Sequence, residues 1–158
     1  MKHEIRFVLN GGERSLEVEA NLTLLQLLRD RLHITSPKRS CEQGECGACT
    51  VILNGKAVNA CLVLAVTVNG KVVETVDGLG KDGLHPLQKH FKEVAASQCG
   101  YCTPGMLMAA KALLDVNPAP TYEQVKEGLS GNMCRCTGYV RPVEAVLAAA
   151  QEIRDSAS

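Results

Sequence analysis

The residues of this chain best suited to chemistry are its eight cysteines, which fall into two groups of four. The first group is Cys41, Cys46, Cys49 and Cys61, and the second group is Cys99, Cys102, Cys134 and Cys136. In a reducing compartment, clustered cysteines are more often metal ligands or redox groups than disulfides. A disulfide framework would also predict little, because eight cysteines allow about 105 pairings. The two groups therefore predict two separate metal or redox sites.

The first group follows the pattern C-x4-C-x2-C-x11-C. This is the spacing of plant-type [2Fe-2S] ferredoxins, in which a tight loop supplies three thiolates and a nearby segment supplies the fourth. Gly44 and Gly47 lie within the loop, where a backbone wrapped around a cluster needs left-handed dihedrals and close approach. A structural zinc site is the alternative, but such sites favour two C-x2-C pairs or histidine ligands. The spacing favours an iron–sulfur cluster at the first group.

The second group follows the pattern C-x2-C-x31-C-x-C, which is less specific for one kind of metal or redox site. Its C-x2-C pair could be a redox dithiol of the thioredoxin type, although it does not lie in a βαβ unit. Four thiolates from two turns could equally hold zinc or a [2Fe-2S] cluster. Spacing alone leaves these alternatives open.

Sequence patterns place the first group in a region of strands and turns. Partial alternation and Asn-Gly turns predict hairpins of residues 2–9 with 15–18, 50–53 with 56–58, and 63–68 with 71–76. Leucines at helical spacing predict one short amphipathic helix over residues 22–32. Strands with one helix packed across them indicate a small α+β domain, which we assign to residues 1–76.

The second group lies in a region with helical patterns. Helices are predicted over residues 84–96, 103–115, 121–130 and 141–154. Thr103 is the expected N-cap of the second of these, with Pro104 in its first turn. Thr121 and Gln124 form the pattern of a capping box. Four short helices indicate a bundle over residues 84–158, and the glycine-rich residues 77–83 read as the linker between the domains.

Composition excludes several classes of function. Lys plus Arg and Asp plus Glu are 17 each, so a basic footprint for nucleic acid is lacking. The amino terminus lacks the apolar stretch of a secretory signal, and no window approaches the length of apolar residues that spans a membrane. The expected location is therefore the cytoplasm.

Three longer segments carry a specific resemblance. They are Cys-Glu-Gln-Gly-Glu-Cys-Gly-Ala-Cys-Thr at 41–50, Gln-Cys-Gly-Tyr-Cys-Thr-Pro-Gly-Met at 98–106 and Gly-Asn-Met-Cys-Arg-Cys-Thr-Gly-Tyr at 131–139. Their sequences, order and separation resemble the small iron–sulfur subunits of the xanthine oxidase family, the molybdenum hydroxylases. The resemblance implies a β-grasp, ferredoxin-like domain followed by a four-helix bundle, each holding one [2Fe-2S] cluster on four of the eight cysteines.

The same resemblance implies a function. The chain would be the electron-transfer subunit of a molybdenum-dependent oxidoreductase and would do no substrate chemistry itself. Electrons would pass from molybdopterin on a large subunit to the bundle cluster, then to the ferredoxin-like cluster, and on to FAD on a medium subunit or to another acceptor. Gln98 would hydrogen-bond the molybdopterin, and Cys136 would both ligate the nearer cluster and accept a hydrogen bond from the pterin. The expected assembly is a hetero-oligomer, which could also dimerise, and the alternative is a free-standing two-cluster ferredoxin.

Overall fold

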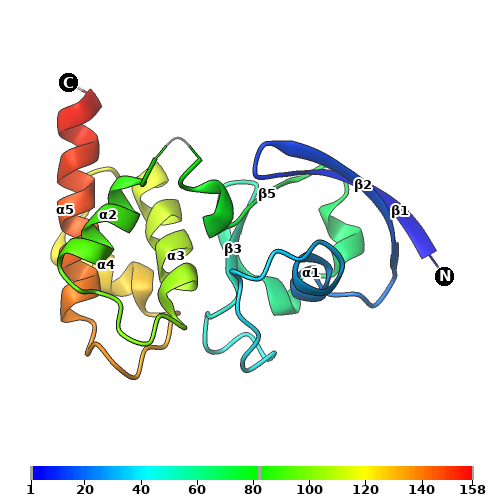
Figure 1. Cartoon of the computed structure of the whole chain (residues 1–158), viewed down its shortest axis with the longest axis horizontal. Coiled ribbons are helices and arrows are strands. Elements are labelled where there is room, and N and C mark those ends of the chain that lie inside the picture. The colour runs from blue at the N-terminus through cyan, green and yellow to red at the C-terminus, as the bar shows by residue number, and fades with distance from the viewer. Residues whose placement is uncertain (1, 82, 158) are drawn as a thin grey trace.

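The computed structural model describes residues 2–81 and 83–157. Within them, a sheet of five strands forms one lobe and four of the helices form the other, and the two lobes lie side by side (Figure 1). The chain passes from the sheet lobe to the helical lobe once, so the order of elements follows the predicted division into a strand-rich half and a helical half.

The sheet has the order β2-β1-β5-β3-β4. Its strands are β1 (Lys2–Leu9), β2 (Gly12–Glu19), β3 (Thr50–Leu53), β4 (Lys56–Asn59) and β5 (Val72–Glu74). The antiparallel hairpins β1–β2 and β3–β4 confirm two of the predicted pairings. The central strand, β5, joins the two hairpins by running parallel to β1 and antiparallel to β3. A mixed sheet of this kind, with a helix across one face, is consistent with a ferredoxin-like domain.

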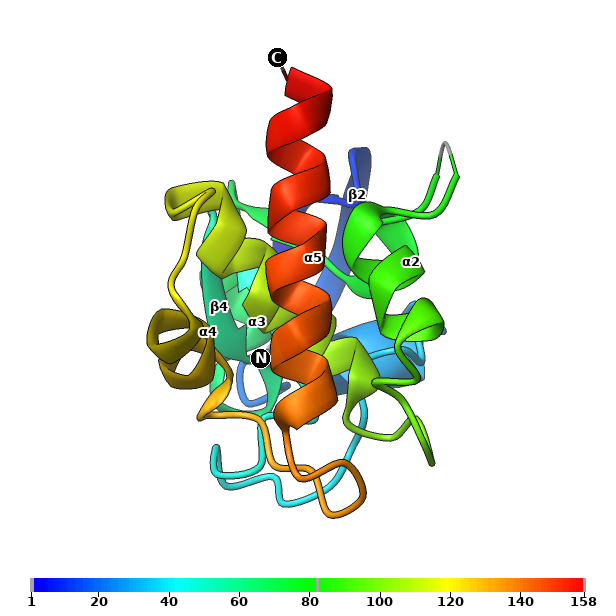
Figure 2. The same cartoon turned by 90° about the vertical axis from the view of Figure 1, so that its left-hand side faces the viewer.

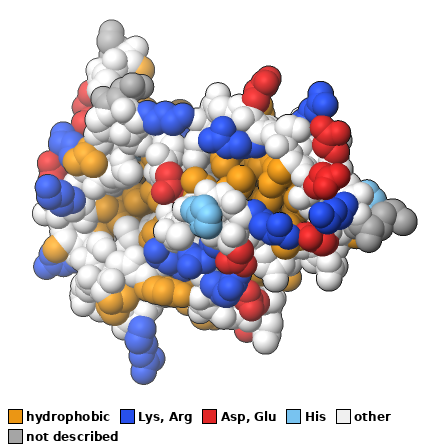
Figure 3. Space-filling model, turned by 45° about the vertical axis from the view of Figure 1, so that its right-hand side comes forward, with side chains coloured by type: hydrophobic (Ala, Val, Ile, Leu, Met, Phe, Trp, Pro, Cys, Tyr) orange, Lys and Arg blue, Asp and Glu red, His pale blue; other side chains and the backbone are white. Residues whose placement is uncertain are grey.

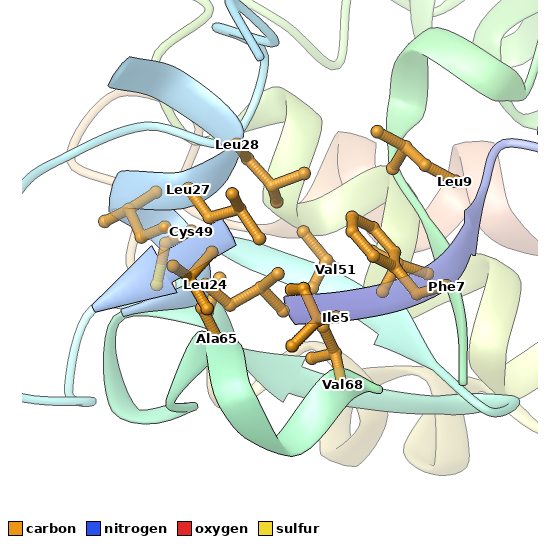
Figure 4. Packing of buried hydrophobic residues seen from close by; sticks show 14 of the residues in the cluster. Ile5, Phe7, Leu9, Leu24, Leu27, Leu28, Cys49, Val51, Ala65 and Val68 are labelled. Carbon is orange, nitrogen blue, oxygen red and sulfur yellow. The ribbon is translucent and has the colours of Figure 1, made fainter. Parts of the chain in front are cut away.

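The predicted helix over residues 22–32 forms in two parts. Thr23 closes a capping box with Gln26, and helix α1 (Leu24–Gln26) continues as a π-helix (Leu27–Arg31). Its leucines pack against the inward-facing side chains of β1, where buried Ile5, Phe7 and Leu9 alternate with more exposed residues. Figure 4 shows Cys49 within this packed cluster, so one of the predicted ligands is part of the hydrophobic core.

The strand predicted for residues 63–68 is wrong. Ala65–Val68 is a 3-10 helix, and Ala65 and Val68 are its buried residues. Side chains three residues apart are eclipsed in a 3-10 helix, so both can face the core. The largely apolar sequence of residues 63–68 did not distinguish this helix from a strand. The following turn then connects to β1 instead, because Arg6 N–H donates to Asn69 Oδ1 at 2.8 Å.

The helical lobe contains all four predicted helices with shifted ends. They are α2 (Pro86–Glu93), α3 (Thr103–Val116), α4 (Tyr122–Leu129) and α5 (Val140–Ala157), labelled in Figure 2. All four contribute to one hydrophobic cluster. The capping box of Thr121 and Gln124 is confirmed. Thr103 as an N-cap is wrong, because helix α3 already begins at this residue and its hydroxyl lies 2.9 Å from that of Ser97.

The segment between the lobes is held by both of them. Val76–Gly78 forms a 3-10 turn, and Val76 and Leu79 pack against the helical cluster. On the other side, Thr75 N–H donates to Asn10 Oδ1 at 2.8 Å, which ties the start of the segment to the β1–β2 turn.

Acidic and basic side chains are interspersed on the face shown in Figure 3, in keeping with the balanced charge. None of the described helices combines the length and apolar character needed to cross a membrane.

Candidate metal centres

The two groups of cysteines meet at one end of the molecule. The loop containing residues 41–50, drawn in cyan, and the closing segment, residues 131–139, drawn in orange, lie at the bottom of the molecule in both views (Figures 1 and 2). A cavity of about 320 Å³ opens between them and is lined by Cys46 together with all four cysteines of the second group. Tertiary folding therefore brings together two sites whose sequences are separated by 37 residues without cysteine, 62–98.

The thiols of the first group occur as two pairs. Cys41 contacts Cys46 on the outer side of the loop, and Cys49 contacts Cys61 on the inner side. Cys49 and Cys61 are buried because the first lies directly before β3 and the second lies in a 3-10 turn directly after β4. The β3–β4 hairpin thus brings the fourth cysteine back to the loop that carries the other three.

Backbone amides of the loop point toward sulfur. Gln43 N–H and Cys46 N–H both donate to Cys41 Sγ, at 3.4 and 3.5 Å. These bonds stabilise the thiolate and lower the pKa of Cys41 to about 6. Burial has the opposite effect on the inner pair and raises the pKa of Cys49 to about 12, so this thiol needs a bound cation to ionise. Gly44 and Gly47 have φ of +80° and +68°, which confirms the predicted need for glycine.

The thiols of the second group form two further pairs. Cys99 contacts Cys136 at the exposed end of the site, and Cys102 contacts Cys134 at the inner end. Burial raises the pKa of Cys102 to about 12. For Cys134, burial acts in the same direction, but hydrogen bonds from Thr137 and Cys136 outweigh it and lower the pKa.

Two residues that sequence reasoning missed support Cys134. Thr137 Oγ1 donates to Cys134 Sγ at 3.2 Å, and the phenolic oxygen of Tyr139 accepts a hydrogen bond from Cys134 N–H at 2.8 Å. Both residues belong to the closing segment, so their proximity in sequence to the C-x-C pair was an available signal. The hydroxyls hold the backbone and the sulfur of one proposed ligand in a single orientation.

The paired thiols suit a binuclear cluster. In a [2Fe-2S] cluster each iron takes two protein ligands, so two pairs of thiolates are the required donor set. Within residues 2–81 and 83–157, no group of three or more His, Cys, Asp or Glu side chains is arranged to hold one metal ion. The donor atoms, the amides directed at sulfur and the left-handed glycines all fit a [2Fe-2S] cluster in each group.

Gln98, the remaining candidate residue, lies at the exposed end of the second site. Gln98 is exposed beside Cys99, and Arg135 is exposed between the two cysteines of the closing segment. Tyr101 and Met133, which are 47% and 60% exposed, add apolar surface around the same cavity. The proposed pterin contacts and this apolar surface therefore share one face of the molecule.

Comparisons with known proteins agree with this architecture. Residues 7–70 match the family "2Fe-2S iron-sulfur cluster binding domain", and residues 75–147 match the family "[2Fe-2S] binding domain". The chain is 50% identical to the nicotinate dehydrogenase small FeS subunit of Eubacterium barkeri, covering 89% of this chain and 90% of that one. It is 49% identical to the nicotine 6-hydroxylase small subunit of Paenarthrobacter nicotinovorans, covering 95% and 91%.

A solved structure is similar over nearly the full length. The crystal structure of quinoline 2-oxidoreductase from Pseudomonas putida 86 contains a chain that matches with a TM-score of 0.93 and 41% identity, covering 98% of this chain and 97% of that one. Fold, sites and matches define a protein with two [2Fe-2S] domains, one ferredoxin-like and one helical. The chain belongs to the small iron–sulfur subunits of the xanthine oxidase family, and it is an electron-transfer subunit of a multi-subunit molybdenum hydroxylase. The free-standing ferredoxin is not favoured.

Proposed function

We propose that all eight cysteines are cluster ligands, four to each site. The observation that carries this assignment is the arrangement of the thiols as two pairs in each group. Bound there, each [2Fe-2S] cluster would supply reversible one-electron chemistry. The chain's own residues would set the conditions for it: backbone N–H groups at Cys41 and the Thr137 hydroxyl at Cys134 stabilise negative charge on sulfur.

The exposed end of the second site is the proposed docking face for the large, molybdopterin-bearing subunit. Cys136 and Cys99 are exposed there, and Gln98 lies beside them with its amide available to the pterin. The apolar surface of Tyr101 and Met133 beside these cysteines favours burial by a partner. In this assignment Cys136 both holds a cluster and accepts a hydrogen bond from the pterin.

The first site is the proposed exit. Its outer ligand Cys41 is half-buried, and the 62% exposed Leu62 packs over Gly44 of the same loop. A flavin-bearing medium subunit or another acceptor would dock on this side. We propose a hetero-oligomer in the cytoplasm, where a reducing environment preserves thiols, and we leave dimerisation of the assembly as a further option.

Two finer features of the fold belong to the same proposal. We place the domain boundary at the segment 77–83, with the ferredoxin-like domain at 1–76 and the helical domain at 84–158. We also propose that α2 to α5 form a four-helix bundle of the family type, which is supported by the single hydrophobic cluster that they share.

The substrate class that we propose is a nitrogen heterocycle, oxidised on the large subunit. The nicotinate dehydrogenase, nicotine 6-hydroxylase and quinoline 2-oxidoreductase described above are all named for such compounds. The test is turnover of the purified complex with nicotinate, quinoline and benzaldehyde, and preference for the aldehyde would contradict this part.

The function is tested by purifying this chain with the subunits that bind it. We expect four iron atoms per chain, a visible iron–sulfur spectrum and a molybdenum-bearing partner. Gln98→Ala should slow reduction of the clusters by substrate while leaving the iron content unchanged, and Gln151→Ala, at an exposed glutamine of α5, is the control. A colourless, zinc-bearing chain would contradict the ligand assignment, and unchanged electron transfer in Gln98→Ala would remove the pterin contact.

A further inference from the structure

A buried asparagine joins the two cluster-bearing regions. Asn132 is 3% exposed, and its Nδ2 donates to Gly47 O at 2.9 Å and to Thr50 Oγ1 at 3.2 Å. These bonds connect residues 85 and 82 positions apart in sequence. A buried amide is costly unless its hydrogen-bonding groups are satisfied, so this side chain strongly favours one arrangement of the two regions.

The bonds from Asn132 belong to a short ladder. Next to it, Met133 N–H donates to Cys46 O at 2.9 Å. Two consecutive residues of the closing segment thus bind two consecutive carbonyls of the first loop. The ladder lies beside the proposed ligands, because Cys46 is itself one of them, Gly47 follows Cys46 directly, and Cys134 follows Met133 directly.

Close packing leaves this junction little freedom to move. A Cβ on Gly47 would lie 2.2 Å from Gly131 O, and a Cβ on Gly105 would lie 2.3 Å from Gly47 O. Gly105 is in the first turn of α3, directly after the loop that carries Cys102. Backbone from the first loop, from the closing segment and from α3 therefore meets around the Gly47 carbonyl group, together with the side-chain amide of Asn132.

We propose that Asn132 is a positioning residue, which fixes the separation and orientation of the two cluster sites and so the coupling between the clusters. The proposal rests on the proposed ligand assignment, because it needs a cluster at each site. The hydrogen bonds of the Asn132 amide go to oxygen atoms, so its effect would pass through Gly47 and Met133 to the ligands beside them. It explains why a polar residue occupies a buried position that an apolar side chain could fill.

The chain offers a matched control for the loss of this amide. Asn59 Nδ2 donates to Gly44 O at 2.8 Å, which is the same type of bond, of similar length, to the same loop. Asn59 belongs to β4, within the sheet lobe, so its bond does not cross to the closing segment. Asn59→Ala should disturb the first loop as much as Asn132→Ala does, without loosening the junction.

The experiment uses electron paramagnetic resonance to measure magnetic coupling between the clusters in the complete complex, treated with excess reductant so that each cluster takes up one electron. Dipolar coupling falls steeply with distance, so a fixed junction gives a single splitting. We expect Asn132→Ala and Asn132→Asp to lose that single splitting and to show a broad distribution, while Asn59→Ala keeps the splitting of the unsubstituted complex. Asn132→Asp retains the volume of the side chain, so it separates loss of the donor from formation of a cavity.

A structural role alone would lower thermal stability and leave the splitting unchanged, and that result in variants with full iron content would overturn the proposal. If a variant loads iron poorly, hydrogen exchange at the Met133 amide, followed by mass spectrometry, reports the same junction. Faster exchange in Asn132→Ala than in Asn59→Ala supports the proposal, and equal exchange contradicts it. A failure of the ligand assignment would be distinguishable, because the unsubstituted complex would then lack the iron–sulfur signals altogether.

Discussion

The two cysteine sites reach the same donor arrangement in different ways. In the first site one loop supplies three cysteines, and a hairpin returns the fourth into the core of the sheet lobe. In the second site the ligands come from two segments 31 residues apart, and the outer pair remains exposed. The first site depends on local backbone geometry, whereas the second depends on the packing of helices.

This difference has consequences for how each site stabilises charge. The first loop directs backbone N–H groups at Cys41, and those groups cannot be removed by substituting side chains. The second site adds a side-chain donor, the Thr137 hydroxyl, to the backbone N–H groups that act at Cys134. The second site should therefore be the one whose properties are more easily changed by substitution.

The largest expected effect is the loss of one cluster without the other. Cys102→Ser removes an inner ligand of the second site, and Cys61→Ser removes the equivalent ligand of the first. Each variant should retain about half of the iron, with one of the two paramagnetic signals, because the two sites use separate ligands. Iron analysis and electron paramagnetic resonance check this result. Loss of both signals in either variant would show that the sites fold as one unit.

The next effect concerns a residue that belongs to one site and touches the other. Gly47 has φ of +68°, and a Cβ there would meet Gly131 O at 2.2 Å. Gly47→Ala should cost about 1–2 kcal/mol from the left-handed backbone and about 1–3 kcal/mol from overpacking. The thermal midpoint of the visible absorbance should fall accordingly. Gly55→Ala, at φ of +80° with nothing within 4 Å, is the control and should show the backbone cost alone.

A smaller effect should separate the reduction potentials of the two sites. Thr137→Val keeps the shape of the side chain but removes the hydroxyl that donates to Cys134 Sγ at 3.2 Å. A donor to sulfur stabilises the more negative, reduced state, so its removal should lower the potential of the second cluster by about 40 mV, equivalent to about 1 kcal/mol. A redox titration should show the first cluster unchanged. Thr67→Val removes a hydroxyl bound to Leu64 O, away from any cysteine, and should shift neither potential.

The smallest effect is a pH dependence confined to the helical lobe. His85 Nδ1 accepts a hydrogen bond from Leu87 N–H at the start of α2, and burial, aided by the positive charge of Lys111, lowers the pKa of His85 below 6.5. The unfolded chain then binds a proton more readily than the folded one, so this contribution to stability is present above pH 6.5 and is lost as the pH falls through and below that value. Thermal unfolding at about pH 7.5 and about pH 5.5 should show the second cluster bleaching earlier in acid.

The matched variant for this prediction is His85→Asn, which can still cap α2 but does not titrate in this range. Its acid sensitivity should be smaller than that of the unsubstituted chain. Equal sensitivity in the two proteins would assign the pH dependence to another group.

Much of the fold could be predicted because its signals are local. The β1–β2 hairpin follows from alternation and an Asn-Gly turn, and the start of α4 follows from a capping box within four residues. The apolar run at 63–68 misled because strand and 3-10 helix both bury such residues, and only the packing of Ala65 and Val68 distinguishes them. Thr103 misled because its hydroxyl found a partner in Ser97, outside its own helix.

By itself the sequence determined that this protein has two cysteine sites and that the spacing of the first is that of a plant-type ferredoxin. It also determined which family the three long segments resemble. It also determined where glycine must relieve a left-handed backbone in the first loop. These properties depend on residue types only a few positions apart in the sequence. Only the tertiary structure decided that the thiols form two pairs in each site, that the sites share one cavity, and that Asn132 reaches across to Gly47. The physical reason is that such contacts join residues distant in sequence. Packing and the need to satisfy buried polar groups select the partner of each residue, and local periodicity does not indicate which partner that is.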